Sequence, residues 1–233
     1  MIRGRSPWKK LCCVQKGANG TMTLLYKELR LAAHPTSIVF AFLGCLVLVP
    51  SYPYSVIFMF GCLAPYITFL NARETNDIWY TAVLPVTKQE IVLGKCRLVV
   101  FFQLFQLLFS IPFVLIRNAM NITNNPVGLD ATVAWYGFGL ILYATFDLVF
   151  LTTFYKSGYQ TGKSFLLAAI PMVFLMVAIE ATAHIPALVW MDSNQSAHMW
   201  MQVPILITGI FCFAVFMRLA YRISAKRFAN VDM

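Results

Sequence analysis

The sequence predicts an all-α membrane protein with six transmembrane helices, both termini in the cytoplasm and an N-terminal amphipathic helix at the membrane interface. The first observation is composition: 60% of the 233 residues are hydrophobic and 12% are charged, against roughly 45–50% and 25% in soluble domains. The second is length, because a helical span needs about 20 apolar residues, which leaves room for six spans and no separate soluble domain. These observations exclude a water-soluble enzyme, a nucleotide-binding domain and a nucleic-acid reader.

The N-terminal region is predicted to have two parts. Residues 1–21 are interpreted as a disordered extension without assigned function, since Met22 is a plausible alternative start and the preceding stretch lacks the pattern of a signal peptide. Residues 22–35 are expected to form the amphipathic interfacial helix, which Pro35 ends. At 100° per residue its apolar side chains fall on one arc, opposite two cations: Leu25, Tyr26, Leu29 and Ala33 against Lys27 and Arg30.

The first two spans form a predicted hairpin. Residues 31–72 carry no charged side chain, and this stretch is too long for a single span. Residues 50–53 divide it, because their two prolines remove backbone donors and their tyrosine suits the interface. The spans are therefore placed at residues 36–49 and 54–70. The first is short, so we expect it to tilt, to begin nearer Leu31 or to stop within the outer leaflet.

Four further apolar segments complete a transmembrane domain over residues 36–219: they are 98–115, 132–154, 164–181 and 201–219. Residues 220–233 are expected to form a basic cytoplasmic tail. Every lysine and arginine except Arg117 lies before the first span, in the loops after the second and fourth spans, or in this tail and the adjoining end of the sixth span, where Arg218 stands. The positive-inside rule then places both termini in the cytoplasm. Orientation and contact with an anionic lipid bilayer account for the net charge of +9, so no nucleic-acid partner is expected.

The loop between spans two and three carries the most informative local pattern. Thr87 and Glu90 have the T-x-x-E spacing of a capping box, with Pro85 just before it and an apolar run just after. This pattern predicts a short cytoplasmic helix that begins at Lys88. The loop is more apolar than solvation requires, which leaves two interpretations open. The helix packs back on its own bundle, or it presents a surface to a partner protein.

Two segments carry a resemblance to a known family: LLYKELRL in the amphipathic helix and YTAVLPVTKQEIVLGK before span three. With its six spans and basic tail, the chain resembles the small permease subunits of bacterial ABC-2 type exporters. The resemblance implies that the loop contains a coupling helix, which sits in a cleft of a separately encoded ATPase. The corresponding positions are Leu84, Pro85, Val86, Thr87, Lys88, Gln89, Glu90, Ile91 and Val92.

The resemblance also implies partners and a location. These are an ABC ATPase subunit and a second permease subunit, as a homodimer or heterodimer, in the inner or plasma membrane of a bacterial cell. No cofactor and no catalytic residue are expected in this chain, because ATP and Mg²⁺ would bind to the partner ATPase.

Asp147 is the carboxylate placed deepest within a predicted span, where ionisable groups are costly and usually functional. Its neighbours Thr145, Thr152 and Thr153 are candidate hydroxyl partners. Substrate contact, a proton relay and a structural hydrogen bond are all open, and we favour the structural role because no basic side chain is predicted at that depth.

Polar side chains also gather near the outer end of span five: they are Glu180, His184, Asp192 and His198. Their spacing matches no known metal motif, so we interpret them as interface polarity. Phenylalanines recur along one face of span three, where they are expected to contact lipid or pack, or to line a path or a subunit interface: they are Phe101, Phe102, Phe105, Phe109 and Phe113.

Taken together, these patterns predict the permease subunit of an ATP-driven exporter for a hydrophobic or amphipathic substrate such as a peptide. The alternative is a six-helix transporter or substrate-binding membrane component that is not driven through this loop. A membrane enzyme ranks third, since the sequence has neither an H-E-x-x-H nor a G-x-S-x-G motif.

Overall fold

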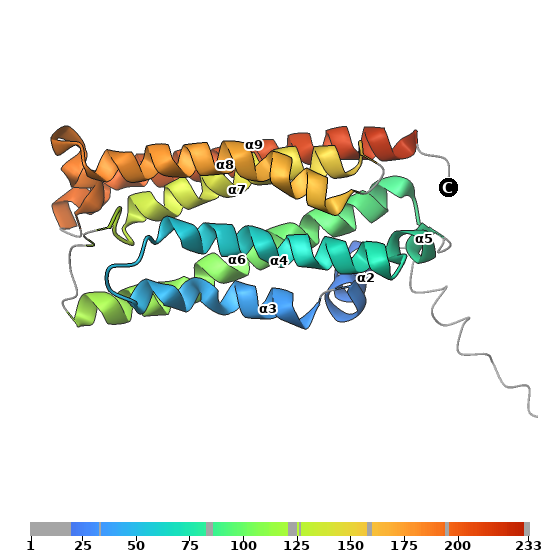
Figure 1. Cartoon of the computed structure of the whole chain (residues 1–233), viewed down its shortest axis with the longest axis horizontal. Coiled ribbons are helices and arrows are strands. Elements are labelled where there is room, and N and C mark those ends of the chain that lie inside the picture. Colours follow the sequence, from blue (N-terminus) through green and yellow to red (C-terminus); the bar gives the residue numbers. More distant parts are fainter. Residues whose placement is uncertain are drawn as a thin grey trace, which may run out of the picture.

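The structure, a computed structural model, describes residues 20–32, 34–82, 86–120, 125, 127–157, 160–193 and 196–230. Over these residues it consists of helices without strands, which confirms the predicted all-α class (Figure 1). Its α-helices are α2 (Gly20–Lys27), α3 (Pro35–Phe42), α4 (Ser55–Glu74), α5 (Asp77–Ala82), α6 (Lys88–Ala119), α7 (Val133–Phe154), α8 (Thr161–Ala183) and α9 (Ser196–Ala229). Three further helical elements are the π-helix η1 (Glu28–Ala32) and the 3-10 helices η2 (Leu43–Leu48) and η3 (Pro186–Asp192). Of the predicted extension, residues 1–19 lie outside the described residues.

Among the described residues, five helices are long and apolar enough to cross a membrane: they are α4, α6, α7, α8 and α9. A sixth candidate is bent, because the segment Leu24–Arg30 meets Pro35–Leu48 at 94°. The His34 Nδ1 atom accepts a hydrogen bond from the Thr36 amide at 3.2 Å and caps α3. Pro35 at the first position of α3 favours this start. Helix α3 therefore begins at Pro35, and the place of the first span within the bilayer stays a prediction.

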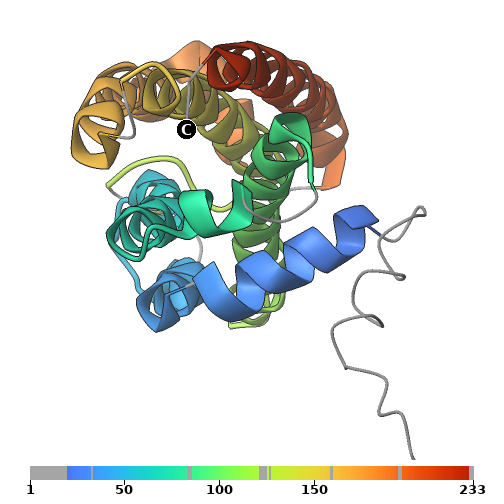
Figure 2. The same ribbon diagram turned by 90° about the vertical axis from the view of Figure 1, so that its right-hand side faces the viewer.

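The helix formed by α2 and η1 crosses the bundle at the end where α6 begins and α9 ends (Figure 2). Its buried face contains Leu24 and Glu28, which are one turn apart. Tyr26 is 61% exposed, and its hydroxyl accepts a hydrogen bond from the Arg30 guanidinium at 2.6 Å. Tyr26, which is on the predicted apolar arc, therefore does not pack against the bundle. Glu28 is buried on the packed face because Lys95 of α6 meets its carboxylate there.

The basic end of the bundle is the right-hand end in Figure 1, where α6 begins and α9 ends. It carries basic side chains from several helices, including Lys88, Lys95 and Arg97 of α6 and Arg218 and Arg222 of α9. The opposite end, called the far end below, carries Arg117. The two ends of the bundle thus differ in positive charge, and the predicted orientation, with the basic end in the cytoplasm, depends on this difference.

Helix α7 packs against both α8 and α9 and supplies much of the core (Figure 2). Its buried side chains include Trp135, Tyr143 and Phe146, which are at most 1% exposed. Glycine permits the closest approach between α7 and α9. A Cβ on Gly209 would lie 2.3 Å from the carbonyl oxygen of Gly137, a distance shorter than any real contact. Small residues allow membrane helices to pack this tightly.

The substitution Gly209→Ala is therefore expected to lower stability by about 1–3 kcal/mol, because the added methyl group forces the two backbones apart. The matched control is Gly162→Ala on α8, where a Cβ meets nothing within 4 Å. Alanine also favours a helix at both positions, so the loss expected at Gly209 has to come from the clash, which Gly162 lacks. Thermal unfolding of the purified variants in detergent compares them. Equal midpoints for the two variants would contradict this account of the glycine contact.

Candidate functional site

The N-terminus of α6 has the capping box predicted from the sequence. The Glu90 amide donates a hydrogen bond to Thr87 Oγ1 at 3.2 Å, and the Thr87 amide donates to Glu90 Oε2 at 2.7 Å. The box satisfies two donors that a helix start otherwise leaves unpaired. It thereby fixes the first turn of α6 at Lys88.

The helix that begins there is not short, so that part of the prediction is wrong. It runs from Lys88 to Ala119 without a break and includes the whole predicted third span. Gly94 and the charged Lys95 and Arg97 do not end it, because no proline follows until Pro112 and Lys95 is neutralised by ion pairs. The separate short helix of this loop is α5, which precedes the capping box.

The predicted coupling positions are divided between surface and core. Ile91 and Val92 are buried, at 2% and 0% exposure, and pack inside the bundle. Thr87 and Gln89 are exposed, while Lys88 is half-buried and donates a hydrogen bond to the Ala229 carbonyl at 3.3 Å. Packing on the bundle therefore holds for Ile91 and Val92, whereas a partner surface at the exposed positions stays a prediction. Val86 packs against the core and Glu90 is half-buried, whereas Leu84 and Pro85 lie outside the described residues.

Four charged side chains form a compact cluster at the basic end, called the Lys95 cluster below: Lys27, Glu28, Asp77 and Lys95. Lys95 Nζ contacts Glu28 Oε2 and lies 2.7 Å from Asp77 Oδ2. Lys27 Nζ lies 2.9 Å from Glu28 Oε1 and 2.8 Å from Asp77 Oδ1. Each cation therefore touches both carboxylates, and the cluster joins α2, η1 and α5 to α6.

The Lys95 cluster was not predicted from the sequence. Burial raises the pKa of Asp77, but the neighbouring charges of Lys95 and Lys27 outweigh this effect and hold the pKa below its ordinary value. One pattern could have revealed the cluster. Lys95 stands four residues after Ile91 and three before Leu98, on the buried face of α6, where an unpaired lysine would be costly.

Asp147 is completely buried, and its partner comes from another helix. Gln103 Nε2 of α6 donates a hydrogen bond to Asp147 Oδ1 at 2.8 Å. Two of the predicted hydroxyl partners, Thr145 and Thr152, instead donate to carbonyl oxygens one turn back in α7. Threonine in a helix commonly makes this local bond. The carboxylate thus links α6 to α7.

At the far end, acidic side chains hold the connecting segments. Glu180 Oε2 accepts a hydrogen bond from the Leu129 amide at 2.8 Å, and Asp192 Oδ1 accepts one from the Asp130 amide. Asp130 also pairs with the buried Arg117 at 3.0 Å. Glu180 and Asp192 therefore bind backbone amides, in keeping with the polar interface role proposed for them. No group of three or more His, Cys, Asp or Glu side chains suited to a metal ion occurs within the described part of the chain.

A family model described as ABC-2 family transporter protein matches residues 23–229. The chain belongs to this family. No curated protein and no solved structure matches it. The match confirms the resemblance inferred from the amphipathic helix and the loop before span three. Together with the long apolar helices, it identifies the protein as a permease component of an ABC transporter and a multi-pass membrane protein.

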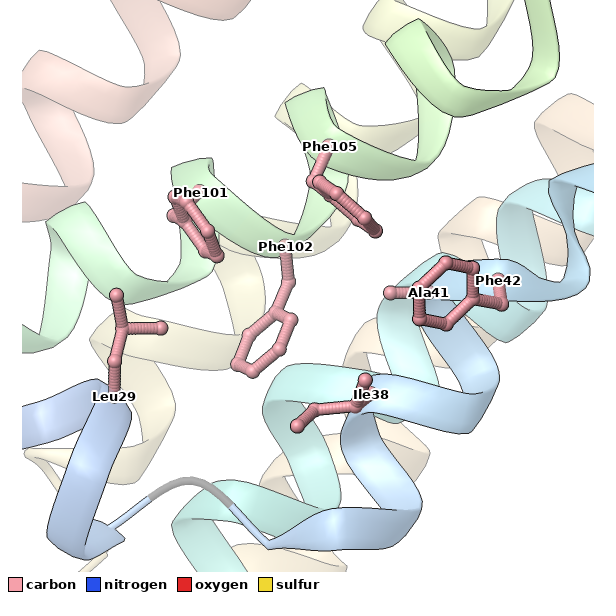
Figure 3. A pocket seen from close by; sticks show the side chains of 7 residues that line it. All are labelled: Leu29, Ile38, Ala41, Phe42, Phe101, Phe102 and Phe105. Atoms are coloured by element: carbon pink, nitrogen blue, oxygen red, sulfur yellow. The ribbon is translucent and has the colours of Figure 1, made fainter.

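In the described part of this ABC-2 permease, two hollows lie beside α6 near the basic end. The smaller, of about 250 Å³, lies between η1, α3 and α6, and the Phe102 ring points into it from α6 (Figure 3). The larger, of about 610 Å³, lies between α2, α6 and α9 and is lined by Arg97 and Arg218 as well as by apolar side chains. Phe101 lines both hollows.

Proposed function

We propose that this ABC-2 chain is the membrane subunit of an ATP-driven exporter, and that a separate ATPase binds at the turn before α6. The observation that carries the proposal is the capped start of α6, which presents exposed Thr87 and Gln89 and continues without a break to Ala119. ATP and Mg²⁺ would bind the partner ATPase, and two permease subunits would assemble in a bacterial plasma membrane with their basic ends in the cytoplasm.

The Lys95 cluster supports a mechanical role for this turn. Because Lys95 of α6 is bound to Glu28 and Asp77, a force on the turn before α6 also reaches η1 and α5. Closure of the partner ATPases would then displace these elements as one unit and bias a two-state arrangement of the helices. This chain contributes no hydrolytic group to the cycle.

The exposed apolar faces support a hydrophobic or amphipathic substrate class. On α6, Phe105 stacks on Phe101 and on Phe109 with centroids 6.1 and 5.9 Å apart, and Phe101 is 40% exposed. These stacked rings offer an aromatic surface to lipid, to a second permease subunit or to a hydrophobic substrate such as a peptide.

Reversing two charges at the turn tests the proposed coupling. Lys88→Glu combined with Glu90→Lys is expected to reduce recovery of the ATPase with the tagged permease, and export, by about tenfold, the change that a loss of roughly 1.4 kcal/mol produces. Glu90→Gln removes the charge but preserves the capping box, so it distinguishes the effect of the surface charge from the effect of a weakened helix start. Lys163→Glu, an exposed reversal at the start of α8, is the matched control. The proposal fails if the unmodified chain recovers no ATPase, or if the double variant exports normally.

For Asp147 we propose the structural role, so Asp147→Asn is expected to leave transport within about twofold of normal. The asparagine oxygen can still accept the hydrogen bond from Gln103. The substitution also breaks none of the ion pairs found among the described residues. Transport is measured in cells and assembly by gel filtration. Normal assembly with abolished transport would instead assign Asp147 to substrate contact or a proton relay.

A further inference from the structure

The larger hollow beside α6 combines an apolar wall with two cations. It is a groove of about 610 Å³ at the basic end, with Leu25 of α2, Phe101 of α6, and Phe213 and Met217 of α9 among its lining residues. The volume falls within the roughly 300–1,000 Å³ of sites that hold small molecules. Figure 2 shows α2, α6 and α9 around this side of the bundle. The groove is therefore large enough for a ligand with an apolar part.

The two cations come from different helices. Arg97 of α6 is half-buried and Arg218 of α9 is exposed, and both line the groove. Within the described residues neither guanidinium forms a salt bridge, while Glu28 and Asp77 at the same end are bound to Lys95. Two uncompensated arginines on one groove favour an anion, and their planar N–H groups match phosphate oxygens.

The apolar surface extends beyond the groove. Phe101 also lines the smaller hollow, where Ile38 of α3 and Phe105 of α6 supply further apolar wall (Figure 3). Arg97 and Arg218 lie at the borders of the predicted membrane segments 98–115 and 201–219. If these borders mark the edge of the hydrocarbon core, a lipid phosphate would lie at this depth, with its acyl chains alongside the helices. Basic pockets between membrane helices bind anionic headgroups in this way.

We infer that the groove is a binding site for one anionic phospholipid of the leaflet at the basic end, which is the inner leaflet in the proposed orientation. Arg97 and Arg218 hold the phosphate, and Phe213 and Met217 contact an acyl chain. Because the lipid contacts α2, α6 and α9, it links the amphipathic helix to the last helix. The inference depends on this orientation but not on the ATPase, so it can fail while the proposed coupling stands.

Native mass spectrometry of the purified full chain in mixed micelles tests the site, with phosphatidylglycerol and phosphatidylcholine of identical acyl chains as probes. The unmodified chain is expected to bind one phosphatidylglycerol at least about tenfold more tightly than phosphatidylcholine. Arg97→Gln with Arg218→Gln is expected to lose that preference. Arg222→Gln with Lys163→Gln, two exposed cations that do not line the groove, is expected to keep it.

Two further measurements identify the source of the anion and the role of the groove. Ala214→Trp fills the groove from α9 without changing charge and is expected to reduce phosphatidylglycerol binding about tenfold. Inorganic phosphate at equal concentration is expected not to displace the lipid. Displacement by phosphate, equal binding of the two lipids, or an unchanged preference in the Arg97→Gln and Arg218→Gln variant would overturn the inference.

Discussion

Replacing Lys95 with methionine is expected to lower the free energy of unfolding by about 3–5 kcal/mol, the cost of breaking a buried ion pair from one side. Lys95 is 1% exposed and contacts the carboxylates of both Glu28 and Asp77. Without it, two acidic groups share the single cation Lys27, and an uncompensated negative charge stays buried. The loss should also free α5 and η1 from α6.

Thermal unfolding in detergent measures the effect, with Lys163→Met as the matched control because Lys163 is exposed. Adding Glu28→Gln to Lys95→Met is expected to recover part of the loss, since it removes the uncompensated charge. If Lys95→Met is as stable as the control, the Lys95 cluster does not hold these helices together.

The same cluster implies a dependence on pH. The pKa of Asp77 is held below its ordinary value in the folded protein, so its ion pairs contribute stability above the unfolded pKa. That contribution is lost as the pH falls through the folded pKa. In Lys95→Met the pKa of Asp77 rises toward its ordinary value, so less stability should be lost on acidification than in the unmodified chain.

Local patterns predicted the helix starts better than they predicted which side chains meet. Thr87 and Glu90 are three residues apart, and their capping box depends only on that spacing. Pro35 likewise marks the start of α3 through its own backbone constraint. Both features could therefore be inferred from a few consecutive residues.

Contacts between distant residues were the part that could not be predicted. Glu28 and Lys95 are 67 positions apart, so a helical projection of residues 22–35 alone gave no reason to bury Glu28 in place of Tyr26. Gln103 and Asp147 are likewise 44 positions apart. The continuity of α6 could not be predicted for the same reason. The turn that contains Lys95 fits a membrane-spanning helix only when distant carboxylates neutralise the lysine.

The far end contains a second buried cation with an equally large expected effect. Arg117 is 1% exposed, pairs with Asp130 Oδ1 at 3.0 Å and donates a hydrogen bond to the Val47 carbonyl at 3.1 Å. Its guanidinium also lies 4.7 Å from the centroid of the Tyr54 ring. In the sequence this arginine is an exception to the charge bias, whereas in the structure its contacts link η2, the N-cap of α4 and the segment before α7.

Arg117→Leu is accordingly expected to cost about 3–5 kcal/mol, because Asp130 keeps a buried charge without its partner. Arg117→Lys should recover only part of this, since an ammonium group lacks the planar fork that reaches carboxylate and carbonyl together. A double-mutant cycle with Asp130→Leu, followed by thermal unfolding in detergent, isolates the pair. A coupling energy near zero would contradict the link. A normal result for Arg73→Leu, an exposed arginine at the end of α4, would show that loss of a basic side chain is not itself destabilising.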